Sequence, residues 1–509
     1  MSSLSTQQTL QAFYLGVFGR AADPDGFNYW SSQIDSGAIE LTDALGAMLQ
    51  SDEFAERQNE LPQSENDVWI DDIYQDFFGR DADSGGAEYW SSLLSQGVSA
   101  QEVIQRIILS ASATDKEALD ATTSIARFYT ENVSNTEYDA DQPLIQQGLR
   151  SNEQLYSDLA ALDATYDTMA LDQVGESLEG RPLYSATVGE GERKLMIVTQ
   201  QHGDEPTGTE AAMLLLEWLS GDSEAAQALR SEMTVTVMPR VNPDGFERWE
   251  QLTYGDAVLD DTIDPRRNSA DMDLNRTWDS SEAIDPALIP EALAVREVLA
   301  AFQPELILDY HNQNNYLNAE GELETISVLW PTNELVDTEI TAAAQQAAMA
   351  VSQGIEGFDF GSLSLYPGSE TPQIARNGLG IDGVPALLIE QRGLEEMEIA
   401  ASGELDVDYS ALSSSLILES LLSMLGVITA MGNDELEMID PALATMIPER
   451  GERIAYEDIY LEGMAEDDGA MLAMNSAEGG SGTIRDPMPD TVEVTGVDTA
   501  AANADMWAA

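Results

Sequence analysis

The sequence contains no cysteine, and histidine occurs only twice in its 509 residues, at His202 and His311. Without cysteine the chain cannot form disulfide bonds or thiolate metal sites. A transition metal would therefore have to bind through histidine, aspartate or glutamate. Both histidines stand at the end of an apolar, strand-like run, in "KLMIVTQQHGDE" and in "ELILDYH". Because histidine is so rare in this chain, these two positions are the first candidates for metal ligands.

Basic residues are scarce as well. The chain has 22 lysines and arginines against 93 aspartates and glutamates, which gives a formal net charge of -71. Such a surface repels nucleic acids and anionic membranes, so we expect neither as a partner. The charge is spread along the whole chain instead of forming an acidic tail. This pattern fits a protein adapted to high salt, or an exported protein that must stay soluble.

The sequence also lacks an obvious targeting or membrane segment. Its first residues, "MSSLSTQQTLQAF", have neither the basic nor the apolar stretch of a cleavable export signal. The most apolar run, residues 415–431, contains Glu419 and falls short of the length of roughly 20 residues that a membrane helix needs. It therefore predicts a buried helix and no membrane span.

The first 100 residues contain an internal repeat with an offset of 60. "FYLGVFGRAADPDGFNYWSSQIDSG" (13–37) returns as "IYQDFFGRDADSGGAEYWSSLLSQG" (73–97). Each unit predicts two helices joined by a tight turn, with Asp23 and Asp83 as helix N-caps. A calcium loop around Asp23 is the alternative, but the second copy does not keep its ligands. The repeat resembles DUF4214, a bacterial domain of undefined role that is often joined to exported or surface proteins.

From about residue 165 the pattern changes to apolar, β-branched runs that alternate with helical stretches. The runs lie at 194–201, 233–241, 305–311 and 385–391. We expect an α/β fold with a mixed, mostly parallel twisted sheet and helices on both faces, preceded by a small all-α repeat domain. The expected division is a repeat domain at 1–115, a helical connector at 116–164, a catalytic domain at 165–432 and an acidic, partly flexible C-terminal region at 433–509.

Polar residues stand where several of the predicted strands end. His202 and Glu205 follow the first strand, "NPDG" (242–245) follows the second, and His311 and Glu390 end the other two. In open α/β sheets, sites form at the carboxyl ends of the strands. Two histidines and a glutamate can hold one zinc ion and leave a position open for water. Glu390 is then a candidate general base.

Several blocks of the chain, in order, resemble the M14 family of zinc carboxypeptidases over roughly residues 165–430. They are "GESLEGRPLYSATVG" (175–189), HGDE, NPDG, "RRNSADMDLNR" (266–276), DYH and "LLIEQRG" (387–393). A single HxxE motif is common by chance, whereas this order of blocks is specific. The resemblance implies one zinc ion per chain, held by His202, Glu205 and His311, with Glu390 as the catalytic glutamate.

The resemblance also implies roles for residues around the metal. Arg266 would polarise the scissile carbonyl and stabilise the oxyanion. Asn275 and Arg276 would hold the terminal carboxylate of the substrate. Asp273 would orient the first zinc histidine. Tyr366 stands where the family has a mobile tyrosine, although the match is looser there.

The pocket that reads the terminal side chain falls between Tyr366 and Glu390. Arg376 lies in this stretch and would favour an acidic terminal residue by charge pairing. Plain structural roles remain open for several residues. His202 and His311 could be a turn and a core histidine, Tyr366 could be packing, and Arg267, Arg392 and Asp244 could serve salt bridges or turns.

We therefore expect a zinc metallocarboxypeptidase that acts on a peptide or a small amide with a free carboxylate. An N-acyl amino acid deacylase or a cell-wall peptide amidase on the same scaffold is the alternative. A non-enzymatic surface protein, in which residues 1–115 serve attachment, is a third interpretation. We expect secretion without a cleavable signal, with possible cell-surface association through 1–115 and a cytoplasmic location as the alternative.

Overall fold

The computed structural model describes residues 6–60, 66–78, 84–111, 149–221, 224–254, 263–318, 324–355, 363–393 and 410–453, with single residues at 82 and between 115 and 130. Asp83, most of the expected connector before residue 149, and the chain after residue 453 lie outside the described residues.

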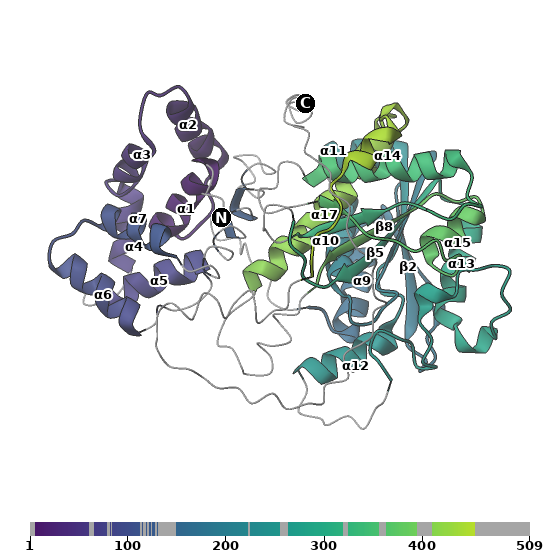
Figure 1. Cartoon of the computed structure of the whole chain (residues 1–509). Helices are drawn as coiled ribbons and strands as arrows, with labels where there is room; N and C mark the ends of the chain where they lie inside the picture. Colours follow the sequence, from purple (N-terminus) through teal and green to yellow (C-terminus); the bar gives the residue numbers. More distant parts are fainter. Residues whose placement is uncertain are drawn as a thin grey trace.

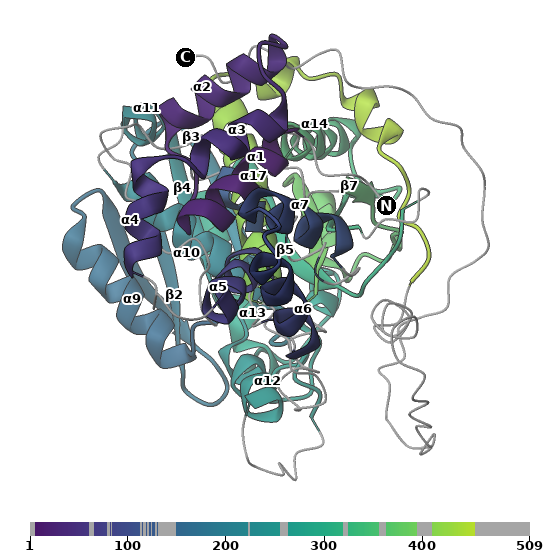
Figure 2. The ribbon, with the colours of Figure 1, turned by 90° about the vertical axis from the view of Figure 1, so that its left-hand side faces the viewer.

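The N-terminal region is helical, and its helices share one apolar core that includes Leu10, Phe13, Ile73 and Phe77. The helices are α1 (Thr6–Phe18), α2 (Pro24–Asp35), α3 (Leu41–Met48), α4 (Asp52–Glu60), α5 (Asn66–Phe78), α6 (Ser84–Ser95) and α7 (Ala100–Ser110). Figures 1 and 2 show these helices, in purple to dark blue, gathered in one group. The expected all-α repeat domain is confirmed.

The turn of the first repeat is held by a helix cap. The Asp23 carboxylate accepts a hydrogen bond from the backbone N–H of Gly26 at 2.7 Å, which starts α2. In the second repeat the Trp90 indole donates to the Tyr74 hydroxyl at 2.9 Å. Asp23 in the first repeat and the Tyr74–Trp90 pair in the second thus have structural tasks, and the cap supports the N-cap interpretation of Asp23.

The second region contains an eight-stranded sheet with the order β1-β2-β4-β3-β5-β8-β6-β7. Its strands are β1 (Met169–Glu176), β2 (Pro182–Val188), β3 (Arg193–Thr199), β4 (Met233–Met238), β5 (Leu306–Gln313), β6 (Ile326–Leu329), β7 (Leu363–Leu365) and β8 (Ala386–Arg392). The neighbours β4, β3, β5 and β8 run parallel. The outer strands add antiparallel pairs, so the sheet is mixed and mostly parallel in its centre.

The apolar runs of the sequence form central strands because both faces of the sheet are covered. In β3, Leu195 and Ile197 enter one apolar core, whereas Met196 and Val198 enter the other. Successive side chains of a strand point to opposite faces, so a continuous apolar run suits a strand between two helical layers. The predicted α/β class is confirmed.

Two helical layers supply these cores (Figure 1). One face is covered by α10 (Thr207–Ser220), α14 (Thr338–Ile355) and α17 (Ser410–Gly432), and the other by α13 (Pro290–Phe302) and α15 (Ala375–Ile381). Further helices are α9 (Asn152–Thr165), α11 (Glu224–Glu232), α12 (Pro243–Tyr254) and four short 3-10 turns, at Leu274–Arg276, Pro286–Leu288, Leu436–Met438 and Pro441–Met446.

Among the described residues the longest helix is α17, and it belongs to the core. Its segment Ser414–Gly432 is the one stretch among the described residues that is long and apolar enough to cross a membrane, and 78% of it is buried inside the protein. Its Glu419 accepts hydrogen bonds from Thr325 and Gln391, both at 2.6 Å. The expected buried helix is therefore present.

The chain stays on the sheet domain after α17. Leu436, Ala444 and Ile447 join the same core as α14 and α17. The Gln346 side chain donates to the backbone oxygen of Ile439 at 2.9 Å. The packed α/β region thus runs past residue 432, the boundary expected from sequence, to at least residue 447.

Candidate active site

The turn after β3 carries His202 and Glu205, and it begins with an unusual backbone conformation. Gln200 has a φ of 57°, in the left-handed region that few non-glycine residues adopt. Its amide accepts from Arg240 Nε at 2.8 Å and donates to the Gly203 carbonyl at 2.7 Å. The surrounding contacts thus fix a turn that reverses the chain and presents His202 at the end of the sheet.

The turns after β3 and β4 pack backbone against backbone. A Cβ on Gly203 would lie 2.1 Å from the carbonyl carbon of Gly245, so no larger residue fits there. The Asn242 side chain accepts from the Gly245 N–H at 2.9 Å and donates to the backbone oxygen of Arg266 at 3.3 Å. The HGDE and NPDG turns therefore pack directly against each other, and the NPDG turn also holds the segment that contains Arg266.

Asp244, in NPDG, has a structural task. It is fully buried, and its carboxylate accepts from the Ser177 hydroxyl at 2.6 Å and from Arg181 at 2.7 Å. The segment "GESLEGRP" is thereby tied to the turn after β4. The burial of Asp244 and its pairing with Ser177 and Arg181 therefore support the structural role for this residue.

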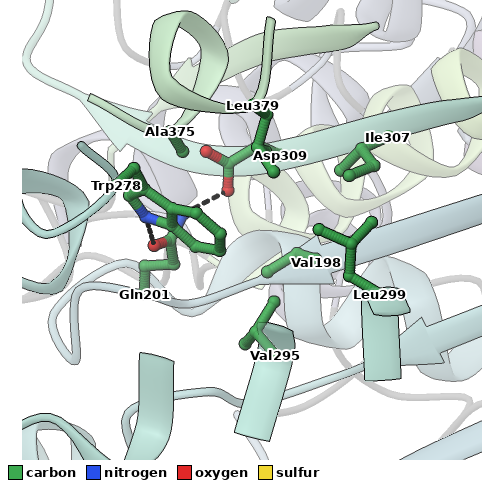
Figure 3. Close-up of a pocket in the computed structure, with 9 residues that line it drawn as sticks. All are labelled: Val198, Gln201, Trp278, Val295, Leu299, Ile307, Asp309, Ala375 and Leu379. Carbon is green, nitrogen blue, oxygen red and sulfur yellow. Dashed lines mark hydrogen bonds between the residues drawn. The ribbon is translucent and has the colours of Figure 1, made fainter. Parts of the chain in front are cut away.

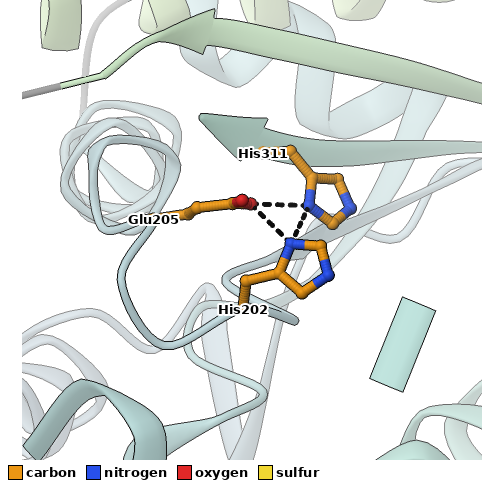
Figure 4. Close-up of side chains that lie close together, drawn as sticks. All are labelled: His202, Glu205 and His311. Atoms are coloured by element: carbon orange, nitrogen blue, oxygen red, sulfur yellow. Dashed lines mark hydrogen bonds and ion pairs between the residues drawn. The ribbon is translucent and has the colours of Figure 1, made fainter. Parts of the chain in front are cut away.

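His202, Glu205 and His311 converge at the carboxyl end of the parallel strands (Figure 4). Glu205 Oε2 lies 2.9 Å from His202 Nδ1 and 2.7 Å from His311 Nδ1. The two Nδ1 atoms are 3.0 Å apart. At most 3% of each residue is exposed. Within the part of the chain that the structure describes, this is the one group of three such side chains that could hold a metal ion.

The donor set and its spacing fit zinc. Zinc binds histidine nitrogen and carboxylate oxygen at about 2.0–2.2 Å, which places tetrahedral ligands roughly 3.3 Å apart. The three observed separations of 2.7–3.0 Å need to widen by only a few tenths of an ångström. Two imidazole nitrogens that face each other in a buried site need either a proton or a metal ion between their lone pairs. The donor set and the spacing of these residues therefore suit a metal ion.

The electrostatics of the three residues favour a positive charge. Burial would raise the pKa of Glu205, but the adjacent imidazoles of His202 and His311 hold this pKa well below its usual range. Burial would lower the pKa of His311, whereas the carboxylates of Asp309 and Glu205 raise it well above its usual value. The site thus keeps Glu205 ionised and attracts a cation to the histidines.

Each histidine has a carboxylate behind it. Asp273 Oδ1 lies 3.1 Å from His202 Nε2, in agreement with its expected place. Asp309 Oδ2 lies 3.2 Å from His311 Nε2, on the same strand two residues earlier. Such partners fix the orientation of the ring and make it a stronger ligand. The sequence interpretation missed Asp309, although the spacing in DYH places both side chains on one face of β5.

Asp309 is itself held from behind by a chain of hydrogen bonds. Gln201 Nε2 donates to Asp309 Oδ1 at 2.7 Å, and the Trp278 indole donates to Gln201 Oε1 at 2.9 Å. Figure 3 shows this chain at the edge of a small cavity whose other walls, such as Val198 and Leu299, are apolar. In these apolar surroundings the carboxylate of Asp309 interacts strongly with the nearby ring of His311, because little water screens its charge.

Glu390 lies beside the metal-binding cluster. On β8 it is in register with His311 of the parallel neighbour β5, so the two side chains share one face of the sheet. Arg266 donates to Glu205 Oε1 at 3.1 Å and to Asp273 Oδ2 at 3.2 Å. Burial would lower the pKa of Arg266, but Asp273, Glu205, Asp204 and Glu390 raise it above its usual value. The expected base and the expected oxyanion-binding arginine thus both flank the cluster.

Asn275 and Arg276 follow Asp273 in the short turn Leu274–Arg276. The Asn275 amide lies 3.3 Å from His311 Nε2 and accepts from the Ala375 N–H at 2.8 Å. Arg276 is exposed, and its Nη1 donates to the Asn275 carbonyl at 2.9 Å. The turn therefore places the Asn275 amide next to His311 and leaves the guanidinium of Arg276 exposed one residue further on.

The residues expected further out occupy different settings. Tyr366 is half-buried directly after β7, and its ring lies 4.5 Å from the guanidinium of Arg450. Arg376 is only 1% exposed, and its guanidinium donates to the carbonyls of Trp330 and Ser369 at 3.1 and 2.6 Å. Burial lowers the pKa of Arg376 to about 10. Arg376 thus holds the segment before α15 by hydrogen bonds to its backbone. A contact between Arg376 and a substrate stays a prediction.

The other uncertain residues are placed as follows. Asp204 is not among the three clustered side chains, and burial raises its pKa to about 6. Arg267 donates to the Asp271 carbonyl at 2.9 Å. Arg392 is fully buried, and its Nε donates to Asn315 at 2.8 Å. Arg267 and Arg392 thus hold neighbouring groups around the site.

Comparison with known proteins agrees with this geometry. Residues 155–357 match the Peptidase_M14 family, zinc carboxypeptidase. This confirms the resemblance to the M14 family for that segment, which contains all three metal-site residues. Residues 1–58 and 56–116 match DUF4214, a domain of unknown function, in agreement with the two predicted repeats.

Individual curated relatives match part of the chain. Carboxypeptidase D of Mus musculus is 29% identical over 160 residues, which are 29% of this chain and 11% of the relative. Carboxypeptidase M of Mus musculus is 31% identical over 143 residues, 25% of this chain and 30% of the relative. The chain thus spans less than a third of the length of these relatives. A metallo-carboxypeptidase structure from Burkholderia cenocepacia has a TM-score of 0.42 at 21% identity, covering 55% of this chain and 69% of that one.

Proposed function

We propose that the α/β region is a zinc metallocarboxypeptidase that hydrolyses the C-terminal amide bond of peptides. The observation that carries this proposal is the buried cluster of His202, Glu205 and His311, with Glu390 in register beside His311. Three protein ligands leave one position of a tetrahedral zinc open, which is typical of catalytic sites. The M14 match over residues 155–357 supports the same conclusion.

A zinc ion bound by these residues would supply Lewis-acid chemistry and lower the pKa of a water at the site. Glu390 takes a proton from this water and directs its oxygen to the carbon of the scissile amide. When the carbon–nitrogen bond breaks, Glu390 delivers the proton to the leaving amine. The place of Glu390 on a central strand, next to the strand of His311, keeps its carboxylate at a fixed position.

The arginines of the site complete the reaction. Arg266 already uses Nε and Nη1 for Asp273 and Glu205, so its remaining nitrogen can donate to the developing oxyanion. Asn275 and Arg276 bind the free carboxylate of the terminal residue through an amide and a guanidinium. The exposed Arg276 is the group that a substrate from solution would meet first. These roles give a preference for substrates with an unblocked terminus.

A substrate panel tests the proposal. Purified protein is incubated with an unblocked peptide, the same peptide with an amidated C-terminus, an N-acyl amino acid and a cell-wall peptide, and released amines are measured by mass spectrometry. We expect release of the terminal residue from the unblocked peptide alone. Preferred cleavage of the N-acyl amino acid or of the cell-wall peptide would instead support a deacylase or an amidase on the same scaffold. Cleavage of the amidated peptide at the same rate would contradict the roles of Asn275 and Arg276.

A further inference from the structure

The segment after the last 3-10 turn returns to the side of the sheet where β7 lies. Residues 447–453, which we call the C-terminal strap, pair with two other segments. The Leu365 N–H donates to the Pro448 carbonyl at 2.7 Å, and the Arg450 N–H donates to the Leu365 carbonyl at 3.0 Å. The Leu317 N–H donates to the Glu452 carbonyl at 3.0 Å. The strap lies outside the segment 155–357 that matches the M14 family.

One guanidinium of the strap, that of Arg450, lies over the rings of two tyrosines. Arg450 lies 3.6 Å from the ring centre of Tyr316 and 4.5 Å from that of Tyr366. Its Nη1 also donates to Gln313 Oε1 at 2.8 Å. Arg450 is half-buried and Tyr316 is 9% exposed, so the stack is largely shielded from water. A planar guanidinium over aromatic rings is a stabilising arrangement.

This stack is connected to the strands of the candidate active site. Gln313 stands on β5 two residues after His311, so the two side chains share one face of the sheet. Gln313 Nε2 donates to the Ser327 hydroxyl on β6 at 2.8 Å. Ser327 is in register with Glu390 on β8. Arg450 therefore joins Tyr366 to the row of residues that contains a metal ligand and the expected base.

We propose that Arg450 is a positioning residue that holds Tyr366 against the wall of the candidate active site, and that the C-terminal strap completes this wall. The inference rests on the proposed function and on the expected role of Tyr366 as the tyrosine that meets the substrate. The hydrogen bond to Gln313 fixes the orientation of the Arg450 guanidinium. The guanidinium in turn fixes the plane and position of the Tyr366 ring. Without Arg450, Tyr366 loses a neighbour on one face and a substrate has to order the ring when it binds.

The test compares Arg450→Met, Arg450→Lys and a matched control, Arg453→Met. Arg453 belongs to the same strap and is exposed. Its backbone is bridged to Tyr316, but its side chain makes no hydrogen bond, ion pair or ring contact with the described residues of the site, so Arg453→Met changes the side chain alone. For Arg450→Met we expect KM for an unblocked peptide to rise about tenfold with kcat changed by less than about twofold, because one shielded cation–π stack and a hydrogen bond are lost. Arg450→Lys keeps the charge without the planar stack and should fall between. Arg453→Met should match wild type.

A double-mutant cycle decides whether Arg450 acts through Tyr366. In a Tyr366→Ala background, Arg450→Met should raise KM by less than about twofold, because contacting residues are not additive. A full additional tenfold rise would overturn the inference, as would an Arg450→Met enzyme with wild-type KM. Thermal unfolding of each variant identifies a general loss of folding, and in that case Arg450→Lys alone is used for the comparison.

Hydrogen exchange separates this inference from the proposed function. Arg450→Met should increase amide exchange in residues 363–368 while Arg453→Met does not, and this readout requires no enzymatic activity. If wild-type protein cleaves no peptide but the exchange pattern is as expected, the function is wrong and the positioning role stands. If wild-type protein is active and neither exchange nor KM responds to Arg450→Met, the positioning role is wrong and the function stands.

Discussion

The rings of His202 and His311 present their Nδ1 atoms to Glu205 because a carboxylate faces the other nitrogen of each ring. Asp273 also pairs with Arg266, so part of its charge is already compensated. Asp309 has an amide partner, Gln201, and otherwise faces His311. Each histidine ring is thus held from behind by a carboxylate, which fixes its orientation and leaves Nδ1 facing Glu205.

Glu390 provides the sharpest prediction at this scale. Glu390→Gln keeps the shape of the side chain but removes the base, so we expect kcat to fall at least about a thousandfold while the protein still binds one zinc ion. Activity on an unblocked peptide and metal content by mass spectrometry measure the two effects. Glu339→Gln, an exposed change at the start of α14, is the control. Near-normal turnover by Glu390→Gln would exclude Glu390 as the base.

Asp309 leads to a prediction about metal affinity. Asp309→Asn removes the negative charge behind His311, and loss of such a partner typically weakens metal binding about 10- to 100-fold. Competition with a chromogenic chelator measures the dissociation constant of zinc. Asp337→Asn, an exposed carboxylate before α14, should leave it unchanged. An unchanged zinc affinity in Asp309→Asn would show that Asp309 has no influence on the site.

The grouping of His202, Glu205, His311 and Glu390 at one edge of the sheet was predictable, because histidine is rare in this chain and all four residues follow or end apolar runs. Asp309 was missed since its task is visible only when the strand places it beside His311 Nε2. Arg450 could not be predicted at all, because 137 residues separate it from Gln313 and only tertiary packing brings them together. For Arg376 the sequence suggested a substrate contact, because a charged residue stood in the stretch expected to form the pocket. In the structure its guanidinium is buried and donates to backbone carbonyls.

At the scale of elements, α14 and α17 cross at unusually close range. A Cβ on Gly426 would lie 2.4 Å from the Ala350 carbonyl, and a Cβ on Gly354 would lie 2.4 Å from the Leu422 carbonyl. The paired glycines thus let the two helix backbones touch. This contact keeps α17 close to the sheet on the face opposite α13 and α15.

Gly426→Ala tests this contact against a matched helical glycine. The added methyl group must push the helices apart, and overpacking of this kind costs about 1–3 kcal/mol of unfolding free energy. Gly46→Ala in α3 meets only the end of the Gln101 side chain, so higher helix propensity should stabilise the protein by up to about 1 kcal/mol. Denaturant unfolding measures both. A Gly426→Ala protein as stable as wild type would contradict the close crossing.

The central strands and covering helices were predictable because a run such as "KLMIVT" is buried on both sides. The strands β1, β2, β6 and β7 were not predicted. β1 has an alternating, partly exposed pattern, and β7 has three residues. Edge strands of this kind carry little apolar signal, so their pairing becomes clear only in the folded sheet.

At the scale of the whole molecule, the charge of -71 works against compact structure through self-repulsion. Salt screens this repulsion, and the screening length falls from about 30 Å at 0.01 M to about 3 Å at 1 M. We therefore expect the melting temperature to rise by several degrees between these NaCl concentrations, measured by circular dichroism. A melting temperature that falls or stays constant would show that the acidic charge does not limit stability. Secretion and surface association through residues 1–115 stay predictions.

The central claim is that the α/β region is a peptidase that depends on one metal ion at His202, Glu205 and His311. The most direct measurement is release of the terminal residue from an unblocked peptide by protein as purified, after removal of metal with a chelator, and after addition of one equivalent of zinc. We expect activity to disappear in the metal-free protein and to return with zinc. Unchanged activity in protein shown to be free of metal would contradict the account.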